Sequence, residues 1–348
     1  MCSGIVFASV SCFNLVEGKI MFDKLRAGRR SFIGMAAIAV SLAGSIGLGA
    51  LSALAHAQTQ AKEFRVGWQK GSNLAILKAR GNLDKRLGAA GVKVTWIEFT
   101  AGPQMLEGLN VGSIDFACVG ETPPVFAQAA GAALVYVANE PPAPDAEKIL
   151  VPKTSLIESV AALKGKRVVL NKGSNVHYLL LRGLERAGLS YADVKVVYLP
   201  PPDARVAFES GDVDAWVIWD PFAQAAIGQI GARELLGGKG ASVENYNFYL
   251  STSSFSKNSP EVLKWALEEI RVTGDWVRSH FDEAAEILAP QIGLSKEITG
   301  DALRHYGYGV TYPLADKVIA NQQAIADAFH ALKLIPKKLD VQSVVWKP

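Results

Sequence analysis

An internal duplication is the feature that most constrains the fold of this chain. The apolar run at residues 64–68 is followed by Lys-Gly-Ser-Asn at 70–73, and the run at 166–170 is followed by the same four residues at 172–175. Each copy then continues into a helical pattern of apolar residues. Each copy therefore predicts a strand, a loop and a helix in that order.

A second repeated pair follows the first at nearly the same offset. Gly-Ser-Ile-Asp at 112–115 precedes a strand that ends at Thr122-Pro123, and Gly-Asp-Val-Asp at 211–214 precedes a strand that ends at Asp220-Pro221. Both strands then lead into the residues Phe-Ala-Gln-Ala-Ala. Two repeated pairs in the same order predict two α/β lobes of like design.

The links between the two copies predict how the lobes are joined. A proline-rich loop at 141–145 leads into an apolar strand at 148–151, and a second apolar strand at 247–251 follows the second copy. The rest of the chain reads as helices, including 260–279 and 314–332, which we expect to return to the first lobe. We predict an α/β fold of two lobes joined by two hinge strands, with a small-ligand cleft between them. The expected limits are 58–150 with 251–348 for lobe I, and 151–250 for lobe II.

Residues 1–57 have the pattern of a signal peptide. Basic residues lie between Lys24 and Arg30, an uncharged run covers 31–55, and Ala55-His56-Ala57 fits a small-residue cleavage site. A retained membrane anchor is the alternative, although four glycines dilute the hydrophobicity of the run. Arg29-Arg30 resembles a twin-arginine export motif, and an ordinary secretory signal stays open. Met21 is a candidate for the true start, because the preceding residues carry no signal pattern.

Composition excludes several function classes once residues 1–57 are set aside. The remainder carries 31 basic and 31 acidic residues without a basic block, which excludes a nucleic-acid-binding protein. Cys118 is then the only cysteine, which excludes an intramolecular disulfide and a multi-cysteine metal site. Its apolar neighbours favour a buried strand residue over a reactive thiol. We expect no cofactor.

Helix starts at the ends of the repeated strands predict an anion site. Capping positions are fitted by Ser72 or Asn73, and by Thr122, Ser174 and Asp220, with Pro123 and Pro221 expected at the first helical position of two of the helices. Open α/β sheets bind ligands outside the carboxyl ends of their strands. Free N–H groups and the helix dipole make each helix start attractive to an anion. We therefore expect a cleft that binds an anion without an arginine cluster.

Side chains near these helix starts add candidate hydrogen-bond donors for three oxygens around a tetrahedral sulfur. They are Gln69, Ser72, Thr122, Ser174, Asn175 and His177. His177 lies in the first turn of its helix, and both a ligand role and a structural role stay open. Glu121 would repel an anion unless it turns away, pairs with Lys70 or Arg205, or binds through water.

Aromatic residues beside the same loops suggest an apolar wall for the rest of a ligand. Trp219 precedes Asp220, and Trp68 precedes Gln69. Trp68 fits the core equally well. Arg205 follows a third strand, and either reaches the cleft or lies in solvent.

Five segments resemble the periplasmic aliphatic sulfonate-binding proteins of ABC importers, over nearly all of 64–346. They are Gly67–Ser72, Ala101–Glu107, Asn110–Asp115, Ala215–Pro221 and 334–346. The resemblance implies a periplasmic binding protein-like (type II) fold, a periplasmic location, a small organic sulfonate as ligand and an ABC importer permease as partner. It also implies oxyanion contacts from Gln69, Gly120, Glu121, Thr122, Ser174, Asn175, His177, Trp219 and Asp220. Where relatives often place an arginine, this chain has Tyr306-Gly307-Tyr308-Gly309, with Arg304 nearby.

The expected function is capture of alkanesulfonates for import as a sulfur source, without catalysis. One alternative is a binding protein for taurine, nitrate or a pyrimidine precursor; taurine would need a carboxylate such as Glu121 or Asp220 facing its amine. A second alternative is a desulfinase-like enzyme with Cys118 as nucleophile. The apolar residues before Cys118 and the lack of a nearby base in the sequence argue against catalysis, and fold alone never implies chemistry.

Overall fold

The computed structural model describes residues 61–347. The predicted signal peptide, its cleavage after Ala57 and the alternative start at Met21 lie outside these residues. Within the described range, no helix combines the length and the apolar character needed to cross a membrane.

The first sheet is built from the first copy of the repeat and one later strand. Its order is β2-β1-β3-β10-β4. β1 pairs in parallel with β2 and β3, whereas β10 is antiparallel to β3 and β4. The bounds are β1 Glu63–Trp68, β2 Lys93–Glu98, β3 Phe116–Gly120, β4 Leu134–Asn139 and β10 Asn247–Thr252.

The second sheet repeats the first in order and direction. Its order is β7-β6-β8-β5-β9, with β6 parallel to β7 and β8, and with β5 antiparallel to β8 and β9. The bounds are β5 Glu147–Val151, β6 Arg167–Leu170, β7 Lys195–Tyr198, β8 Ala215–Trp219 and β9 Arg233–Gly237. Each sheet thus has four strands of its own and one antiparallel strand next to the edge. The predicted duplication and the α/β fold class are confirmed.

The two expected hinge strands are β5 and β10, and each pairs inside one sheet. β5 follows the first crossing of the chain, at residues 140–146, and belongs to the second sheet. β10 follows the second crossing, at residues 242–246, and returns to the first sheet. The lobe limits at residues 150 and 250 stay a prediction, since β5 begins at Glu147 and β10 at Asn247.

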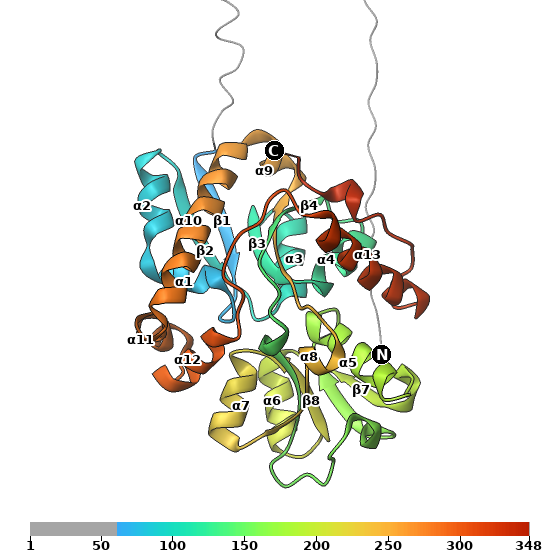
Figure 1. Ribbon diagram of the computed structural model, residues 1–348. Helices are drawn as coiled ribbons and strands as arrows, with labels where there is room; N and C mark the ends of the chain where they lie inside the picture. Colours follow the sequence, from blue (N-terminus) through green and yellow to red (C-terminus); the bar gives the residue numbers. More distant parts are fainter. Residues whose placement is uncertain (1–60, 348) are drawn as a thin grey trace, which may run out of the picture. The chain divides into compact units, whose positions relative to one another are not determined.

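Helices flank both sheets, and the C-terminal ones return to the first sheet as expected (Figure 1). α10 packs on α1 and α2, while α13 packs on α4. α12 also contacts α7 of the second repeat, so it bridges the two lobes. The bounds are α1 Asn73–Arg80, α2 Asn82–Ala89, α3 Gly102–Asn110, α4 Thr122–Ala129, α5 Asn175–Arg186, α6 Pro201–Glu209, α7 Phe222–Ile230, α8 Gly238–Ala241, α9 Ser253–Asn258, α10 Pro260–Ser279, α11 Phe281–Ile292, α12 Lys296–Arg304 and α13 Asp316–Ala331.

Buried aliphatic and aromatic side chains form a core on each face of the first sheet and a core around the second. Phe64, Phe116 and Tyr249 pack together in one of them, with ring centroids 5.5 Å and 5.7 Å apart for the successive pairs. The second sheet buries Trp216 against Phe208. Removing this much apolar surface from water is the main force that holds strands and helices together.

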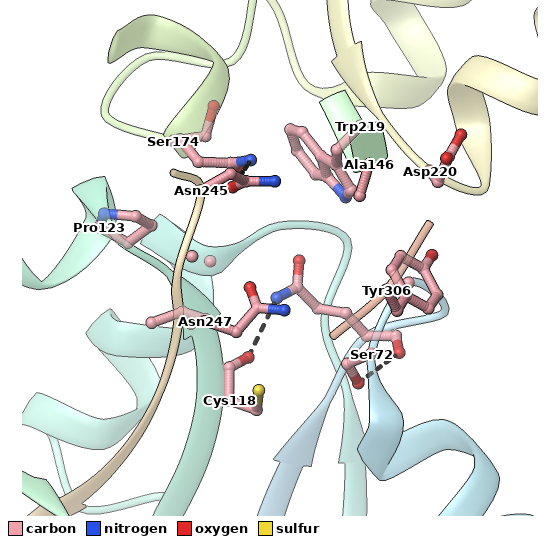
Figure 2. A pocket seen from close by; sticks show the side chains of 16 residues that line it. Ser72, Cys118, Pro123, Ala146, Ser174, Trp219, Asp220, Asn245, Asn247 and Tyr306 are labelled. Carbon is pink, nitrogen blue, oxygen red and sulfur yellow. Dashed lines mark hydrogen bonds between the residues drawn. The ribbon is translucent and has the colours of Figure 1, made fainter. Parts of the chain in front are cut away.

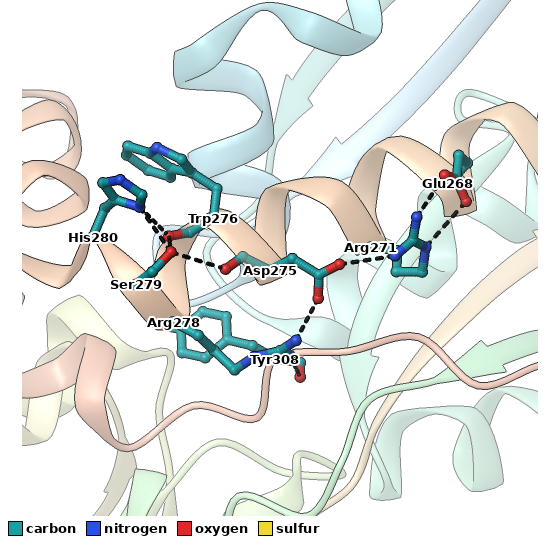
Figure 3. Close-up of polar contacts among 8 residues, drawn as sticks. All are labelled: Glu268, Arg271, Asp275, Trp276, Arg278, Ser279, His280 and Tyr308. Atoms are coloured by element: carbon teal, nitrogen blue, oxygen red, sulfur yellow. Dashed lines mark hydrogen bonds and ion pairs between the residues drawn. The ribbon is translucent and has the colours of Figure 1, made fainter.

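An ion-pair network on α10 fixes the segment that follows α12 (Figure 3). Arg271 pairs with Glu268 and with Asp275, each at 2.8 Å, and Asp275 also pairs with Arg278. Arg278 in turn donates to the backbone carbonyl of Tyr308 at 2.6 Å. Exposed ion pairs contribute little individually. The network therefore matters mainly because it holds the backbone at Tyr308 in place.

Candidate ligand-binding site

A small cavity lies where the two sheets face each other, and both repeats contribute to its wall (Figure 2). The first repeat supplies the loops after β1 and β3, the second repeat supplies the loops after β6 and β8, and the two crossings complete it. Its space for water is about 30 Å³, enough for one or two molecules. The lining residues are Gln69, Gly71, Ser72, Gly102, Cys118, Val119, Gly120, Pro123, Ala146, Ser174, Asn175, Trp219, Asp220, Asn245, Asn247 and Tyr306.

Seven of the ten predicted site residues line this cavity. They are Gln69, Ser72, Gly120, Ser174, Asn175, Trp219 and Asp220. Glu121, Thr122 and His177 do not line it, and each is fully buried behind it. The repeat and the strand-end rule thus place most of the predicted residues together in space.

The helix starts at Ser72 and Ser174 leave their first N–H groups free. Both serines occupy the N-cap position, Ser174 as predicted and Ser72 as one of two predicted candidates, but neither hydroxyl caps its helix. Ser72 Oγ donates to the carbonyl of Gln69 at 3.0 Å, and Ser174 Oγ donates to the carbonyl of Asn171 at 2.7 Å. The N–H groups of the first two residues of α1 and of α5 donate to none of the described residues. Such N–H groups at a helix start form an anion site.

The other two helix starts differ from the prediction by one residue. The N-cap of α4 is Glu121, and Thr122 is the first helical residue. The N-cap of α7 is Pro221, and Phe222 is the first helical residue. Asp220 still accepts a hydrogen bond from the backbone N–H of Gln224 in the first turn of α7, at 3.1 Å.

Asp220 also contacts the segment that follows α12. Its Oδ2 lies 2.6 Å from Nδ1 of His305, which follows α12. Burial raises the pKa of Asp220, and the hydrogen bond from His305 opposes that shift. The backbone carbonyl of Asp220 faces Gly71 so closely that a Cβ at Gly71 would lie 2.2 Å from that oxygen. The lobes are therefore in direct contact beside the cavity.

His177 lies in an aromatic pocket behind the start of α5. Its Nδ1 accepts from the N–H of Gly173 at 3.3 Å, and its Nε2 lies 2.8 Å from the hydroxyl of Tyr191. The rings of Phe126 and Phe329 pack on it. Burial, with a smaller contribution from the charge of Lys172, lowers the pKa of His177 to about 4. The imidazole is therefore neutral at pH 7. His177 is also absent from the cavity wall.

Glu121 is buried, and burial favours its protonated form near neutral pH. Its Oε2 accepts the N–H of Tyr246 at 3.0 Å, and burial raises its pKa to about 8. Neither expected partner reaches it, because Lys70 donates to the carbonyl of Ile292 and Arg205 pairs with Glu209. A protonated carboxyl group carries no charge, so the raised pKa reduces the repulsion expected between Glu121 and an anion.

Two more buried carboxyl groups lie beside the cavity. Glu147 accepts from Asn175 at 2.8 Å, and burial followed by the nearby Glu121 raises its pKa well above the usual range. Glu140 accepts from Asn73 at 2.7 Å, from Asn247 at 2.8 Å and from the hydroxyl of Tyr249. Burial raises the pKa of Glu140 to about 6, and these hydrogen bonds oppose the shift.

The remaining sequence candidates fall outside the cavity. Trp68 is 5% exposed and packs in the core, with the ammonium of Lys78 over its ring at 4.8 Å. Arg205 forms a partly exposed ion pair with Glu209. Trp68 is therefore a core residue. Arg205 is a partly exposed helix residue outside the cavity wall.

Sequence reasoning missed three polar side chains in the cavity wall. Asn245 comes from the second crossing, Asn247 is the first residue of β10, and Tyr306 comes from the segment after α12. The only signal for the asparagines was their place at the start of a predicted hinge strand. Tyr306 stood out only as a departure from the family pattern.

Known proteins of similar sequence match nearly the whole chain. Residues 88–283 match the NMT1/THI5-like family. The aliphatic sulfonates-binding protein of Escherichia coli K12 is 41% identical over 312 residues, covering 89% of this chain and 96% of that protein. This chain belongs to the aliphatic sulfonates-binding protein family. The predicted family resemblance is confirmed.

Solved structures of this family share the fold. The alkanesulfonate-binding protein of Xanthomonas axonopodis pv. citri, bound to MOPS, is 40% identical, with a TM-score of 0.79 over 83% of this chain and 99% of that one. The periplasmic aliphatic sulphonate binding protein of Escherichia coli is 42% identical, with a TM-score of 0.75 over 83% of this chain and 93% of that one. These sulfonate-binding relatives are binding proteins rather than enzymes. The ligand contacts in this chain stay a prediction.

Proposed function

We propose that this protein is the substrate-binding component of an ABC importer and captures aliphatic sulfonates in the cavity between its lobes. Relatives at 40% identity or more are named for sulfonate binding, and one was solved with MOPS, a buffer that carries a sulfonate group. The ligand class is therefore inferred from the family. The N–H groups at the cavity give a physical reason why an anion would bind there.

The observation that carries the proposal is the pair of opposed helix starts with free N–H groups. α1 in the first repeat and α5 in the second both begin at the cavity, and both N-cap hydroxyls turn away from the first N–H groups. A sulfonate is a permanent anion whose three oxygens accept several hydrogen bonds. Donors from both lobes bound to one group would also hold the lobes closed.

The proposed contacts follow from this arrangement. Gln69, Ser72, Gly120, Ser174, Asn175, Trp219 and Asp220 line the cavity and would meet the ligand through side chains or adjacent backbone N–H groups. Glu121 and Thr122 would contribute backbone N–H groups at the start of α4. His177 would act only indirectly, by supporting the loop that carries Ser174.

Location and partner follow from the same proposal. Residues 1–57 would direct export and be removed, leaving the mature protein in the periplasm. The partner would be the permease of an importer in the inner membrane, and the ligand is a sulfur source after import.

Binding without catalysis is part of the proposal. Cys118 lines the cavity, yet burial raises the pKa of its thiol well above the usual range. The thiolate is the nucleophilic form, so a thiol with a raised pKa is a poor candidate for attack on sulfur. We expect no release of sulfite or sulfinate from a bound sulfonate.

Native mass spectrometry and calorimetry of the mature protein test the proposal. The panel contains linear sulfonates from one to eight carbons, taurine, sulfate, nitrate, and butyrate as a carboxylate matched to propane-1-sulfonate. We expect one equivalent of a sulfonate to bind, and butyrate to bind at least tenfold more weakly. Tight binding of nitrate or sulfate with no binding of any sulfonate would overturn the proposal.

A further inference from the structure

The floor of the cavity is formed by Asn247, the first residue of β10 (Figure 2). Its Nδ2 donates to Oε2 of Glu140 at 2.8 Å. Glu140 lies outside the cavity wall, whereas Asn247 is part of it. The carboxamide therefore turns its N–H₂ group away from the ligand space and leaves its oxygen, Oδ1, on the cavity side.

The chemistry of Glu140 fixes this orientation. An ionised carboxylate only accepts hydrogen bonds, so the group facing it must be a donor. Glu140 is 1% exposed, and it also accepts from Nδ2 of Asn73 at 2.7 Å and from the hydroxyl of Tyr249. A flipped Asn247 would place its oxygen against a buried carboxylate oxygen with no hydrogen between them. Such an arrangement is strongly unfavourable.

Gln69 adds a second acceptor to the same floor. Its Nε2 donates to the backbone carbonyl of Cys118 at 3.3 Å, which is also an acceptor only. The Gln69 side chain is buried and lines the cavity, so its Oε1 is the end left for a ligand. The floor thus presents carboxamide oxygens, while the helix starts at α1 and α5 present N–H groups.

We propose that this floor selects sulfonates that carry a hydroxyl or ammonium group on the short carbon chain next to the sulfonate, and that Glu140 is the positioning residue that sets this preference. The inference rests on the proposed function and narrows its ligand class. A ligand without a donor would leave Oδ1 of Asn247 buried and unpaired when the lobes close. Sites built to pair a polar ligand group discriminate strongly against analogues that lack it.

Three ligands of nearly equal size isolate the effect. Propane-1-sulfonate, 2-hydroxyethanesulfonate and 2-aminoethanesulfonate differ only in a terminal methyl, hydroxyl or ammonium group. We expect calorimetry at pH 7.5 to give Kd values about ten- to hundredfold lower for both donor-bearing ligands than for propane-1-sulfonate. An apolar floor would give the opposite order, because a hydroxyl group is costlier than a methyl group to remove from water.

Glu140→Gln tests the positioning role. The new amide N–H₂ would face Asn247, whose carboxamide would then rotate to accept and turn its own N–H₂ group toward the ligand. We expect the preference for 2-hydroxyethanesulfonate to fall to within about threefold of propane-1-sulfonate. The hydroxyl ligand is decisive because it carries no extra charge, so loss of the Glu140 charge cannot explain its change. The ammonium ligand is also a donor but carries a positive charge. Comparing its Kd with that of the hydroxyl ligand therefore separates charge attraction from hydrogen bonding.

Two further variants keep the result interpretable. Tyr249→Phe removes another donor to Glu140 without touching Asn247, and it should keep the wild-type preference. Asn247→Ala removes the acceptor itself and should abolish the preference, even if Glu140→Gln fails to fold. Equal Kd values for the methyl and hydroxyl ligands in the wild type would overturn the inference. An unchanged ratio in both Glu140→Gln and Asn247→Ala would overturn it as well. Failure of all three ligands to bind would instead count against the proposed function.

Discussion

His177 combines a position near the anion site with an environment that keeps it uncharged. It follows Ser174 by three residues, which left a ligand role open from the sequence. In the structure its ring contacts Tyr191, Phe126 and Phe329. Its backbone N–H donates to the carbonyl of Ser174 at 2.9 Å. Neither the side chain nor the N–H is therefore free to meet a ligand.

Replacing His177 by Phe should change how stability depends on pH, and not how binding does. The pKa of His177 falls from 6.5 to about 4 on folding, so the unfolded chain binds more protons between these values. Stability therefore falls as pH drops from 6.5 to 4, by up to about 1.4 kcal/mol per pH unit. Urea unfolding at several pH values should show this contribution in the wild type and its loss in His177→Phe.

The pH profile of Kd is the contrasting measurement. We expect the same profile from pH 8 to 6 for the wild type and for His177→Phe, because a neutral buried ring contributes no charge to the ligand. A wild-type affinity that rises as pH falls, with the rise absent in the variant, would restore the charged role.

Glu121 marks the limit of what local sequence shows. From the sequence, Glu121 would repel an anion unless it turned away, paired with a cation or bound through water. The structure instead buries it against Tyr246 and Gln322, both more than one hundred residues away in sequence. Burial of this kind depends on tertiary packing, so no local pattern could have given its raised pKa.

At the scale of elements, the close contact between Gly71 and the carbonyl of Asp220 links the loop after β1 to the loop after β8. Gly71→Ala should weaken ligand binding by about 1 to 3 kcal/mol, because a Cβ 2.2 Å from that oxygen opposes the approach of the lobes. Calorimetry should give the larger Kd. Small-angle scattering at saturating ligand should give a larger radius of gyration than for the wild type.

Gly88→Ala is the matched control for this change. Gly88 lies in α2, and a Cβ there would meet no atom within 4 Å. Alanine in a helix is favoured over glycine by about 0.5 to 1 kcal/mol, so this variant should be slightly more stable and bind normally. Equal affinity of the two variants would mean that the lobes need not approach this closely.

Elements that repeat were predictable, and the crossings between them were less so. The four strand-loop-helix units carry their own apolar periodicity and helix-start residues, so their place and order were correct. The helices at 260–279 and 314–332 were found within two residues of α10 and α13. Asn245 lies in the short crossing without periodicity, and Asn247 is the polar residue that begins the strand after it. Their place in the cavity depends on how the second crossing packs on Glu140 and Asn175.

For the whole molecule, one duplication accounts for two sheets of the same strand order and for a cavity with helix starts from both. That much followed from sequence because strand direction decides which ends of two sheets carry the loops. The direction of individual side chains did not follow. The serine hydroxyls turn back to Gln69 and Asn171, a choice between two local hydrogen bonds that the sequence leaves equal.

The cavity wall contains no Lys, Arg or His among its described residues, and residues 58–348 balance 31 basic against 31 acidic side chains. Attraction of an anion to backbone dipoles at contact distance is little affected by dissolved ions, unlike attraction between separated charges. Affinity should therefore stay within about twofold between 50 and 500 mM NaCl, as measured by calorimetry. A steep loss with salt would reveal a cation at the ligand, with Lys70 and Arg205 the first residues to replace. If affinity does not depend on salt, the protein would capture its ligand equally well in dilute fresh water and in brine.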